Sequence, residues 1–151
     1  MSTRTKPIAY WITTVLVAFA MFSGGIGELT RQPGNLEVVT ILGYPTYFLT
    51  IIGLWKVAGA IALLVPRFPL LKEWAYAGIF FNMTGAAASH LAVGDYGIGA
   101  FHLIVTISLA GLTVLSWALR PASRRLVPVT NGHAAVDRVA AAPRPSFPSA
   151  G

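Results

Sequence analysis

Four long apolar segments alternate with short polar segments along the first 120 residues. The apolar segments run over about residues 8–27, 47–65, 74–93 and 97–119. The hydrocarbon core of a bilayer is about 30 Å thick, and a helix needs about 20 apolar residues to cross it. Prolines lie next to the ends of these segments, as is typical of helix boundaries: Pro7, Pro45, Pro66 and Pro121. The pattern predicts an all-α fold, a bundle of four transmembrane helices in residues 1–120.

The first apolar segment also has features of a secretory signal peptide. Arg4 and Lys6 precede it, and Ala18-Phe19-Ala20 resembles a cleavage site. The apolar run nevertheless continues through Ile26, which is longer than the usual core of a signal peptide. We therefore expect this segment to remain in the protein as its first span.

The two longest regions outside the predicted spans are the first loop and the C-terminal segment. The loop over residues 28–46 contains Gln32-Pro33-Gly34-Asn35, a turn signal, and then apolar residues at helical spacing from Leu36 to Gly43. This pattern predicts a turn followed by a short helix on the membrane surface. Residues 121–151 contain five of the ten prolines, together with arginines and Ala- and Ser-rich spacers. Because such a composition cannot bury a core, we expect a disordered tail there.

The composition is that of a membrane protein. Hydrophobic residues make up 55% of the chain and charged residues 11%, whereas an ordinary soluble domain carries about 25% charged residues. This difference excludes a soluble enzyme. The chain has no cysteine, which excludes disulfides, dithiol redox exchange and thiolate metal sites.

The net charge of +6 arises mainly from one side of the predicted bundle. With four spans, the N-terminus, the second loop and the tail share that side, which holds nine basic residues, and the opposite side holds Arg31 alone. The positive-inside rule then places both termini in the cytoplasm. We expect a multi-pass protein of the inner membrane whose basic residues set its topology and do not bind nucleic acid.

Lys56 lies near the centre of the second predicted span. It is about 14 Å from the start of that span at 1.5 Å per residue, too deep to reach the headgroups easily. A charge inside a span costs about 2.5–3.5 kcal/mol on insertion scales, so such a residue is a candidate functional residue. Asn82 has a similar depth in the third span. We take Lys56, Asn82 and the adjacent Trp55 as candidate ligand-binding residues; the competing interpretation is a lysine that only joins helices.

A second polar group is expected near the outer ends of the spans. His90 and His102 flank a short loop that contains Asp95, and Glu28 closes the first span at the same level. Because these depths match, we expect Glu28, His90 and His102 to converge in a pocket open to the outer leaflet. Together with Lys56, these three residues are candidate catalytic acids and bases and candidate ligand-binding residues.

Three interpretations of this outer group compete. The histidines are able to ligate haem or zinc, although residues spaced across two helices are weak evidence for a metal site, and we do not favour it. They are also able to exchange protons with a quinone-like ligand or to hold its head group. The third interpretation is a purely structural link between helix ends. Thr106, Thr113 and Ser116 in the fourth span are expected to bond to their own backbone.

Distinctive motifs lie between Leu42 and Asp95. They are Leu42-Gly43-Tyr44-Pro45, Gly53-Leu54-Trp55-Lys56, Lys72-Glu73-Trp74-Ala75-Tyr76-Ala77-Gly78, Thr84-Gly85-Ala86, Ser89-His90 and Gly94-Asp95. Together they resemble the bacterial DoxX-like membrane family, and with the flanking helices the resemblance covers about residues 6–120. It implies a compact four-helix membrane bundle. Family members often have Asp at the position of Asn82, and without that charge Lys56 is expected to be neutral or bonded to carbonyl oxygens.

The resemblance implies a function in outline. Relatives include the small subunit of an archaeal thiosulfate:quinone oxidoreductase and DoxX proteins linked to membrane-associated oxidative-stress complexes. We therefore expect an accessory or ligand-binding subunit that binds a lipophilic, quinone-like molecule and is linked to membrane redox metabolism. The alternative is a small membrane enzyme, an isomerase or cyclase, that acts on a lipophilic substrate by acid/base chemistry. Expected partners are the lipid bilayer, a lipophilic small molecule, and a membrane redox protein or a second copy of the chain.

Overall fold

The computed structural model of the chain describes residues 5–95 and 98–126. This part of the chain is helical, which confirms the predicted all-α class for it. Its elements are α1 (Thr5–Leu29), α2 (Pro33–Ile41), α3 (Tyr47–Leu64), α4 (Pro69–Val93), α5 (Ile98–Leu119) and a 3-10 helix, η1 (Ala122–Arg124).

Three of these helices are long and apolar enough to cross a membrane. They are α1, α3 and the part of α5 from Gly99 to Leu119. The predicted third span lies within α4, which has 25 residues but is not one of the three. Its polar and charged side chains, Lys72, Glu73 and Asn82 among them, make α4 less apolar than the other long helices.

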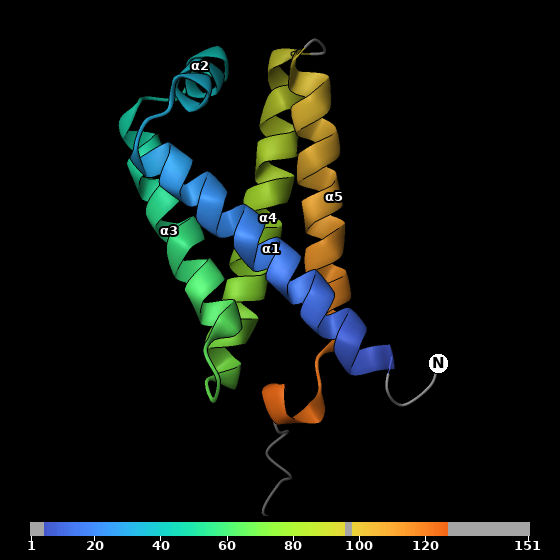
Figure 1. Cartoon of the computed structure of the whole chain (residues 1–151). Coiled ribbons are helices and arrows are strands. Elements are labelled where there is room, and N and C mark those ends of the chain that lie inside the picture. Colours follow the sequence, from blue (N-terminus) through green and yellow to red (C-terminus); the bar gives the residue numbers. More distant parts are fainter. Residues whose placement is uncertain (1–4, 96–97, 127–151) are drawn as a thin grey trace, which may run out of the picture.

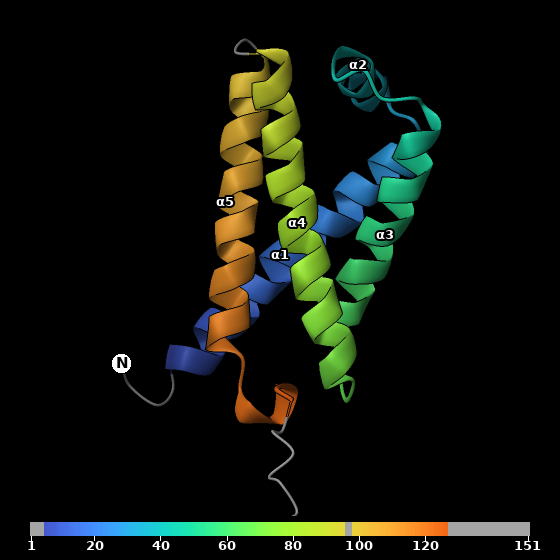
Figure 2. The same ribbon diagram turned by 180° about the vertical axis from the view of Figure 1, so that it is seen from behind.

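The long helices pack with α1 running diagonally across the others (Figure 1). α4 and α5 form an antiparallel pair and lie side by side in both views (Figures 1 and 2). α1 begins near the C-terminal end of α5 and ends near the N-terminal end of α3, and it packs against both helices. Because of this tilt, the end of α1 that carries Glu28 lies with α3.

The first loop contains the short helix that the sequence predicts, but its start differs. α2 begins at Pro33, so the residues expected to form a turn are instead the first turn of the helix. The backbone oxygen of Gln32 accepts bonds from the N–H groups of Asn35 (2.9 Å) and Leu36 (3.1 Å). Proline suits this position because the first N–H groups of a helix have no partner within the helix.

α4 also begins earlier than predicted, at Pro69. Lys72 is therefore in the first turn of a helix and is buried, although the sequence placed it in a loop. The other end of α4 stops at Gly94, whose φ of 68° is a left-handed conformation that glycine adopts without strain. There the N–H of Asp95 donates to the backbone oxygen of His90 (3.3 Å), which begins the turn toward α5.

The core lies where α1, α3, α4 and α5 meet. It is made of apolar side chains, including Val17, Met21, Leu63, Ile79 and Met83. The outside of the bundle also carries large apolar side chains, such as Phe19, Trp55, Trp74 and Phe81. Extended apolar surface of this kind is typical of a protein whose outer face contacts lipid.

The predicted tail begins within the described residues. Residues 121–126 belong to the structure and include η1, and the Arg124 guanidinium lies over the ring of Trp11 (4.5 Å). The remainder of the predicted tail, residues 127–151, lies outside the described part of the chain.

Candidate functional site

Lys56 lies near the middle of α3, and its amine donates a hydrogen bond to Oε1 of Glu28, near the end of α1. The two side chains are largely buried, with 14% of Lys56 and 12% of Glu28 exposed. An ion pair in this position replaces the neutral or carbonyl-bonded lysine expected from the sequence. The reason is the tilt of α1, which brings Glu28 against α3.

A close approach of two glycines allows this pair to form. A Cβ atom on Gly25 of α1 would lie 2.9 Å from the backbone oxygen of Gly53 in α3. A Cβ atom on Gly53 would lie 2.8 Å from the backbone oxygen of Gly25. The backbones therefore touch at a point where no larger residue fits. Glu28 and Lys56 each follow one of these glycines by three residues, so each lies one turn beyond its glycine on the same face of its own helix.

The ion pair leaves hydrogen-bonding capacity unused. Oε2 of Glu28 is buried and has no hydrogen-bond partner in the described part of the chain. Lys56 has three N–H donors, and Glu28 is the acceptor that the structure assigns to it. The pair is thus neutral overall, and Lys56 retains N–H groups that are able to donate to the oxygen of a carbonyl or hydroxyl group.

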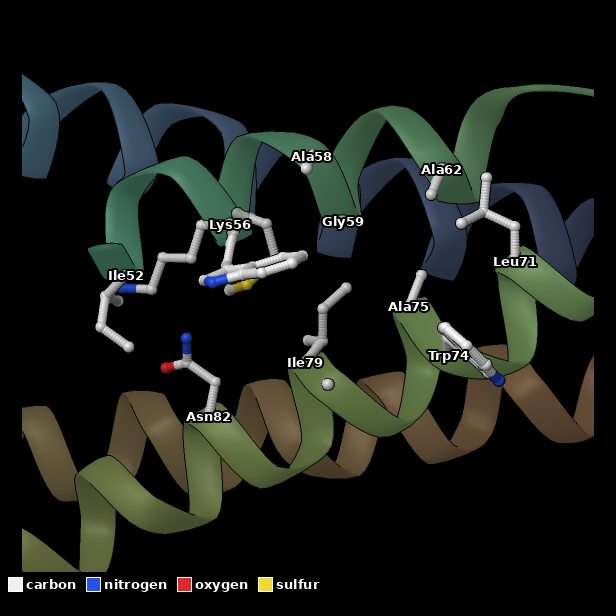
Figure 3. Close-up of a pocket in the computed structure, with 13 residues that line it drawn as sticks. Ile52, Lys56, Ala58, Gly59, Ala62, Leu71, Trp74, Ala75, Ile79 and Asn82 are labelled. Atoms are coloured by element: carbon white, nitrogen blue, oxygen red, sulfur yellow. The ribbon is translucent and has the colours of Figure 1, made fainter. Parts of the chain in front are cut away.

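Lys56 also lines a cavity of about 330 Å³ between α3 and α4. Asn82 of α4 contributes an amide to the same cavity, and Figure 3 shows Lys56 and Asn82 extending into it from opposite helices. The structure therefore brings together two of the residues that the sequence placed at similar depth. The other lining side chains are apolar or aromatic: Met21, Ile52, Trp55, Ala58, Gly59, Ala62, Leu71, Trp74, Ala75, Gly78 and Ile79.

Two tryptophans place this cavity at the lipid-facing surface. Trp55 is 69% exposed and Trp74 is 71% exposed, and both line the cavity. In a bilayer these exposed indole rings contact lipid, so the cavity borders the lipid. Trp55, a candidate from the sequence, is thus placed beside Lys56 on the wall of the cavity.

His90 and His102 form a separate cluster with Asp95. The two imidazole rings are stacked, with centroids 5.2 Å apart and planes inclined by 7°. His90 is buried, and its Nδ1–H donates to Oδ2 of Asp95 (3.3 Å). The pairing of the histidines across the α4–α5 turn agrees with the short loop between them.

The outer pocket that the sequence predicts is therefore divided between two places. Glu28 pairs with Lys56, whereas His90 contacts His102 and Asp95. Figure 1 shows why: the C-terminal end of α1 lies beside α3 and away from the ends of α4 and α5 where the histidines sit. Sequence counting assigns matched depths correctly only when the helices are nearly parallel.

The stacked rings do not form a haem or zinc site in this arrangement. The nitrogen lone pairs of an imidazole lie in the plane of its ring, so two parallel rings direct their lone pairs side by side and not toward one metal ion. Within residues 5–95 and 98–126, no group of three or more His, Cys, Asp or Glu side chains has the arrangement of a metal site.

At the opposite end of the bundle, the contacts of Ser116 differ from the prediction that it bonds to its own backbone. Ser116 bonds to Oγ1 of Thr14 (2.7 Å) and to the hydroxyl of Tyr76 (2.9 Å), linking α5 to α1 and α4. Thr106 and Thr113 do bond to their own backbone, as expected. A serine facing two other helices is not recognisable from spacing within its own helix.

Comparison with protein families gives a match over most of the chain. A family model described as the DoxX-like family matches residues 12–118, which is more than half of the 151 residues. The matched region contains the ion pair, the cavity and the histidine cluster. Comparisons with curated proteins and with solved structures gave no match.

Proposed function

The chain belongs to the DoxX-like family, and we propose from this premise that it binds a neutral lipophilic molecule in the cavity between α3 and α4. The ligand carries a carbonyl or hydroxyl group, as a quinone does. In this proposal the protein is an accessory or ligand-binding subunit linked to membrane redox metabolism.

The membrane topology is part of the same proposal: four spans, in the inner membrane, with both termini in the cytoplasm. α4 is then the fourth span in addition to the three apolar helices. It packs against α3 and α5, and its outward side chains include large apolar ones, Leu70, Trp74, Phe81 and Leu91. A helix packed between spanning helices, with such side chains exposed, suits a lipid environment.

The observation that carries the ligand proposal is the neutral ion pair beside an apolar cavity. Because the charges of Lys56 and Glu28 cancel, the site offers no net attraction to an anion or a cation. The cavity of about 330 Å³ lies within the usual range for small-molecule sites, about 300–1,000 Å³, and has the usual apolar walls with few polar groups. It has room for a ring-sized head group.

The polar groups of the site lie deep in the bundle, near the middles of α3 and α4, and its apolar wall continues toward Leu71 and Trp74. A phospholipid headgroup stays at the membrane surface, so it does not reach polar groups at this depth. A quinone-like ring enters the hydrocarbon region easily, with its oxygen accepting a bond from Lys56 or Asn82 and its ring against Trp55.

Titration with decylubiquinone, a quinone with a short apolar tail, tests this proposal on the full-length protein in detergent. Trp55 and Trp74 line the cavity, so occupancy is expected to quench tryptophan fluorescence with a saturating dependence on quinone concentration. The variant Asn82→Leu removes the amide at similar volume, and we expect its affinity to fall about tenfold, the value of one lost hydrogen bond.

Thr84→Val is the matched control. Thr84 is on the same helix but bonds to the backbone oxygen of Phe80 (2.9 Å) and does not line the cavity. Its variant is expected to bind the quinone as the unmodified protein does. Quenching that does not saturate, or equal affinity in Asn82→Leu and the unmodified protein, would contradict the proposal.

A second candidate function rests on the unpartnered Oε2 of Glu28. A carboxylate with a vacant acceptor beside an ammonium is able to take a proton from the carbon next to a carbonyl, while Lys56 hydrogen-bonds to the carbonyl oxygen. Return of the proton to another carbon gives an isomerisation, which needs no oxidant or reductant. Deuterium incorporation from D₂O into a co-purified carbonyl lipid, absent in Glu28→Gln, would favour this enzyme function over simple binding.

A further inference from the structure

The end of the bundle where α1 begins and α5 ends carries a large excess of positive charge. Six basic residues lie there within the described part of the chain, against one acidic residue, Glu73. The basic residues are Lys6, Arg67, Lys72, Arg120, Arg124 and Arg125. We name this region the basic end. Arg120, Arg124 and Arg125 follow the residues matched by the family model, which ends at residue 118.

Arg124 is held in place at the basic end by three contacts. Its guanidinium lies over the ring of Trp11 (4.5 Å), and Nη1 donates to the hydroxyl of Tyr10 (3.3 Å) and to the backbone oxygen of Leu63 (3.4 Å). A planar guanidinium fixed on an aromatic ring keeps its remaining N–H groups in a defined direction. Arg124 is therefore a positioned cation and not a freely moving surface side chain.

Arg120 is more deeply buried, with 4% of the residue exposed. Its Nη2 pairs with Oε1 of Glu73 (2.8 Å), and Trp117 donates to Oε2 of the same carboxylate (2.8 Å). Nη1 of Arg120 is buried and has no hydrogen-bond partner among the described residues. Glu73 is thus engaged at both oxygens, and one arginine donor at this end remains unsatisfied.

Unlike Arg120, Lys72 has no acidic partner among the residues that the structure describes. Its amine bonds to backbone oxygens of α3, including that of Leu63 (2.7 Å), and Arg124 donates to the same oxygen. Two cations that share one carbonyl oxygen lie close together and repel each other. Since the one carboxylate that residues 5–95 and 98–126 place at this end is paired with Arg120, an anion from outside this part of the chain would compensate the excess.

We propose that the basic end binds the phosphate group of an anionic phospholipid, with the guanidinium of Arg124 as its principal contact. Trp11, Trp74 and Trp117 lie at this end of the bundle. Because tryptophan is enriched at the headgroup level of membranes, the basic end is expected to lie at the depth of the phosphate groups. Arginine forms two parallel bonds to phosphate, which gives this contact geometric specificity beyond simple attraction. This site is separate from the cavity between α3 and α4.

Thermal unfolding of the full-length protein in a nonionic detergent tests the proposal with three additives: phosphatidylglycerol, phosphatidylcholine and inorganic phosphate. At a concentration about a hundredfold above its Kd, phosphatidylglycerol is expected to raise Tm by roughly 5 °C or more. Phosphatidylcholine and inorganic phosphate are expected to have little effect. An equal shift with both lipids would overturn the proposal, and a full shift with inorganic phosphate would replace the lipid by the free anion.

Arg124→Gln and Lys6→Gln distinguish a built site from general attraction. Both variants remove one positive charge from the basic end, but Lys6 is exposed and Arg124 contacts Trp11 and Tyr10. We expect Arg124→Gln to lose most of the shift produced by phosphatidylglycerol and Lys6→Gln to keep it. Equal losses in the two variants would show diffuse attraction and would rule out the site. Arg124→Lys keeps the charge but cannot form two parallel bonds to phosphate. If Arg124→Gln does not fold, Arg124→Lys takes its place and is expected to lose about half of the shift.

Discussion

Two lysines lie inside this bundle, and their surroundings differ. Lys72 is 1% exposed, and its amine donates to three backbone oxygens, those of Ala62 (2.9 Å), Leu63 (2.7 Å) and Val65. Lys56 has a carboxylate partner, Glu28, and faces a cavity. All three donors of Lys72 are satisfied within the protein, whereas Lys56 has one hydrogen-bond acceptor, Glu28, among the described residues.

The difference shows that burial alone does not identify a functional lysine. Lys72 caps the end of α3, where the last carbonyl groups of the helix have no partner within the helix and carry partial negative charge. Its role is to join α3 to α4. Lys56 has donors left for a molecule in the adjacent cavity, and for this reason it is the stronger candidate for ligand binding.

The largest effect that this comparison predicts is on stability, in Lys72→Met. Methionine has a similar volume but no N–H groups, so three backbone oxygens at the end of α3 lose a charged donor. Each such bond contributes about 1.5 kcal/mol, so we expect the free energy of unfolding to fall by about 4–5 kcal/mol. This free energy is measured by unfolding the protein in mixed micelles with an increasing fraction of dodecyl sulfate.

Lys6→Met is the control for Lys72→Met. Lys6 is exposed near the start of α1, so its replacement is expected to change the free energy of unfolding by less than about 0.5 kcal/mol. Quinone binding in Lys72→Met, measured below its unfolding range, is expected to be normal. A stable Lys72→Met protein that has lost quinone binding would reverse the assignment of the two lysines.

Lys56→Met is expected to have a smaller effect on stability and a larger one on binding. Considered from the sequence alone, this change removes a desolvation cost and leaves stability similar or higher. The ion pair alters that expectation, because the buried carboxylate of Glu28 would lose its partner, at a cost of about 3 kcal/mol. Decylubiquinone quenching and unfolding in mixed micelles are measured on the same preparation.

The double variant Glu28→Gln/Lys56→Met separates the two roles. Without either charge, most of the lost stability should return, since replacing both members of a buried pair is often neutral. Quinone binding should remain weak, because the donor is still absent. A double variant that binds quinone normally would show that the pair serves packing only.

The helices and the histidine contact were predictable from the sequence. Apolar runs of about 20 residues determine spanning helices with little dependence on their neighbours, and α1, α3 and α5 agree with three of the predicted spans. The contact between His90 and His102 follows from a short loop, which requires the two helix ends to be adjacent.

The partner of Lys56 was not predictable in the same way. Glu28 lies near the end of α1, and counting residues along straight, parallel helices places it in the outer leaflet, above Lys56. The pair forms because α1 is tilted and because Gly25 and Gly53 let the two backbones touch. Tilt is determined by contacts between helices, which no pattern within one helix contains.

The smallest expected effect concerns this glycine contact, through Gly25→Ala. The new Cβ would lie 2.9 Å from the backbone oxygen of Gly53 and 3.0 Å from Cβ of Lys56. Because a backbone atom cannot move aside cheaply, α1 must shift away from α3, at a cost of about 2 kcal/mol. The shift also separates Glu28 from Lys56, so quinone binding is expected to weaken along with stability.

Gly24→Ala provides a control one residue away. A Cβ on Gly24 meets nothing within 4 Å, and alanine favours a helix over glycine by up to about 1 kcal/mol. Gly24→Ala should therefore be as stable as the unmodified protein or slightly more stable, with normal quinone binding. If Gly25→Ala and Gly24→Ala behave alike, the close approach of α1 and α3 does not determine the ion pair, and Lys56 would be held in the site by α3 and α4 alone.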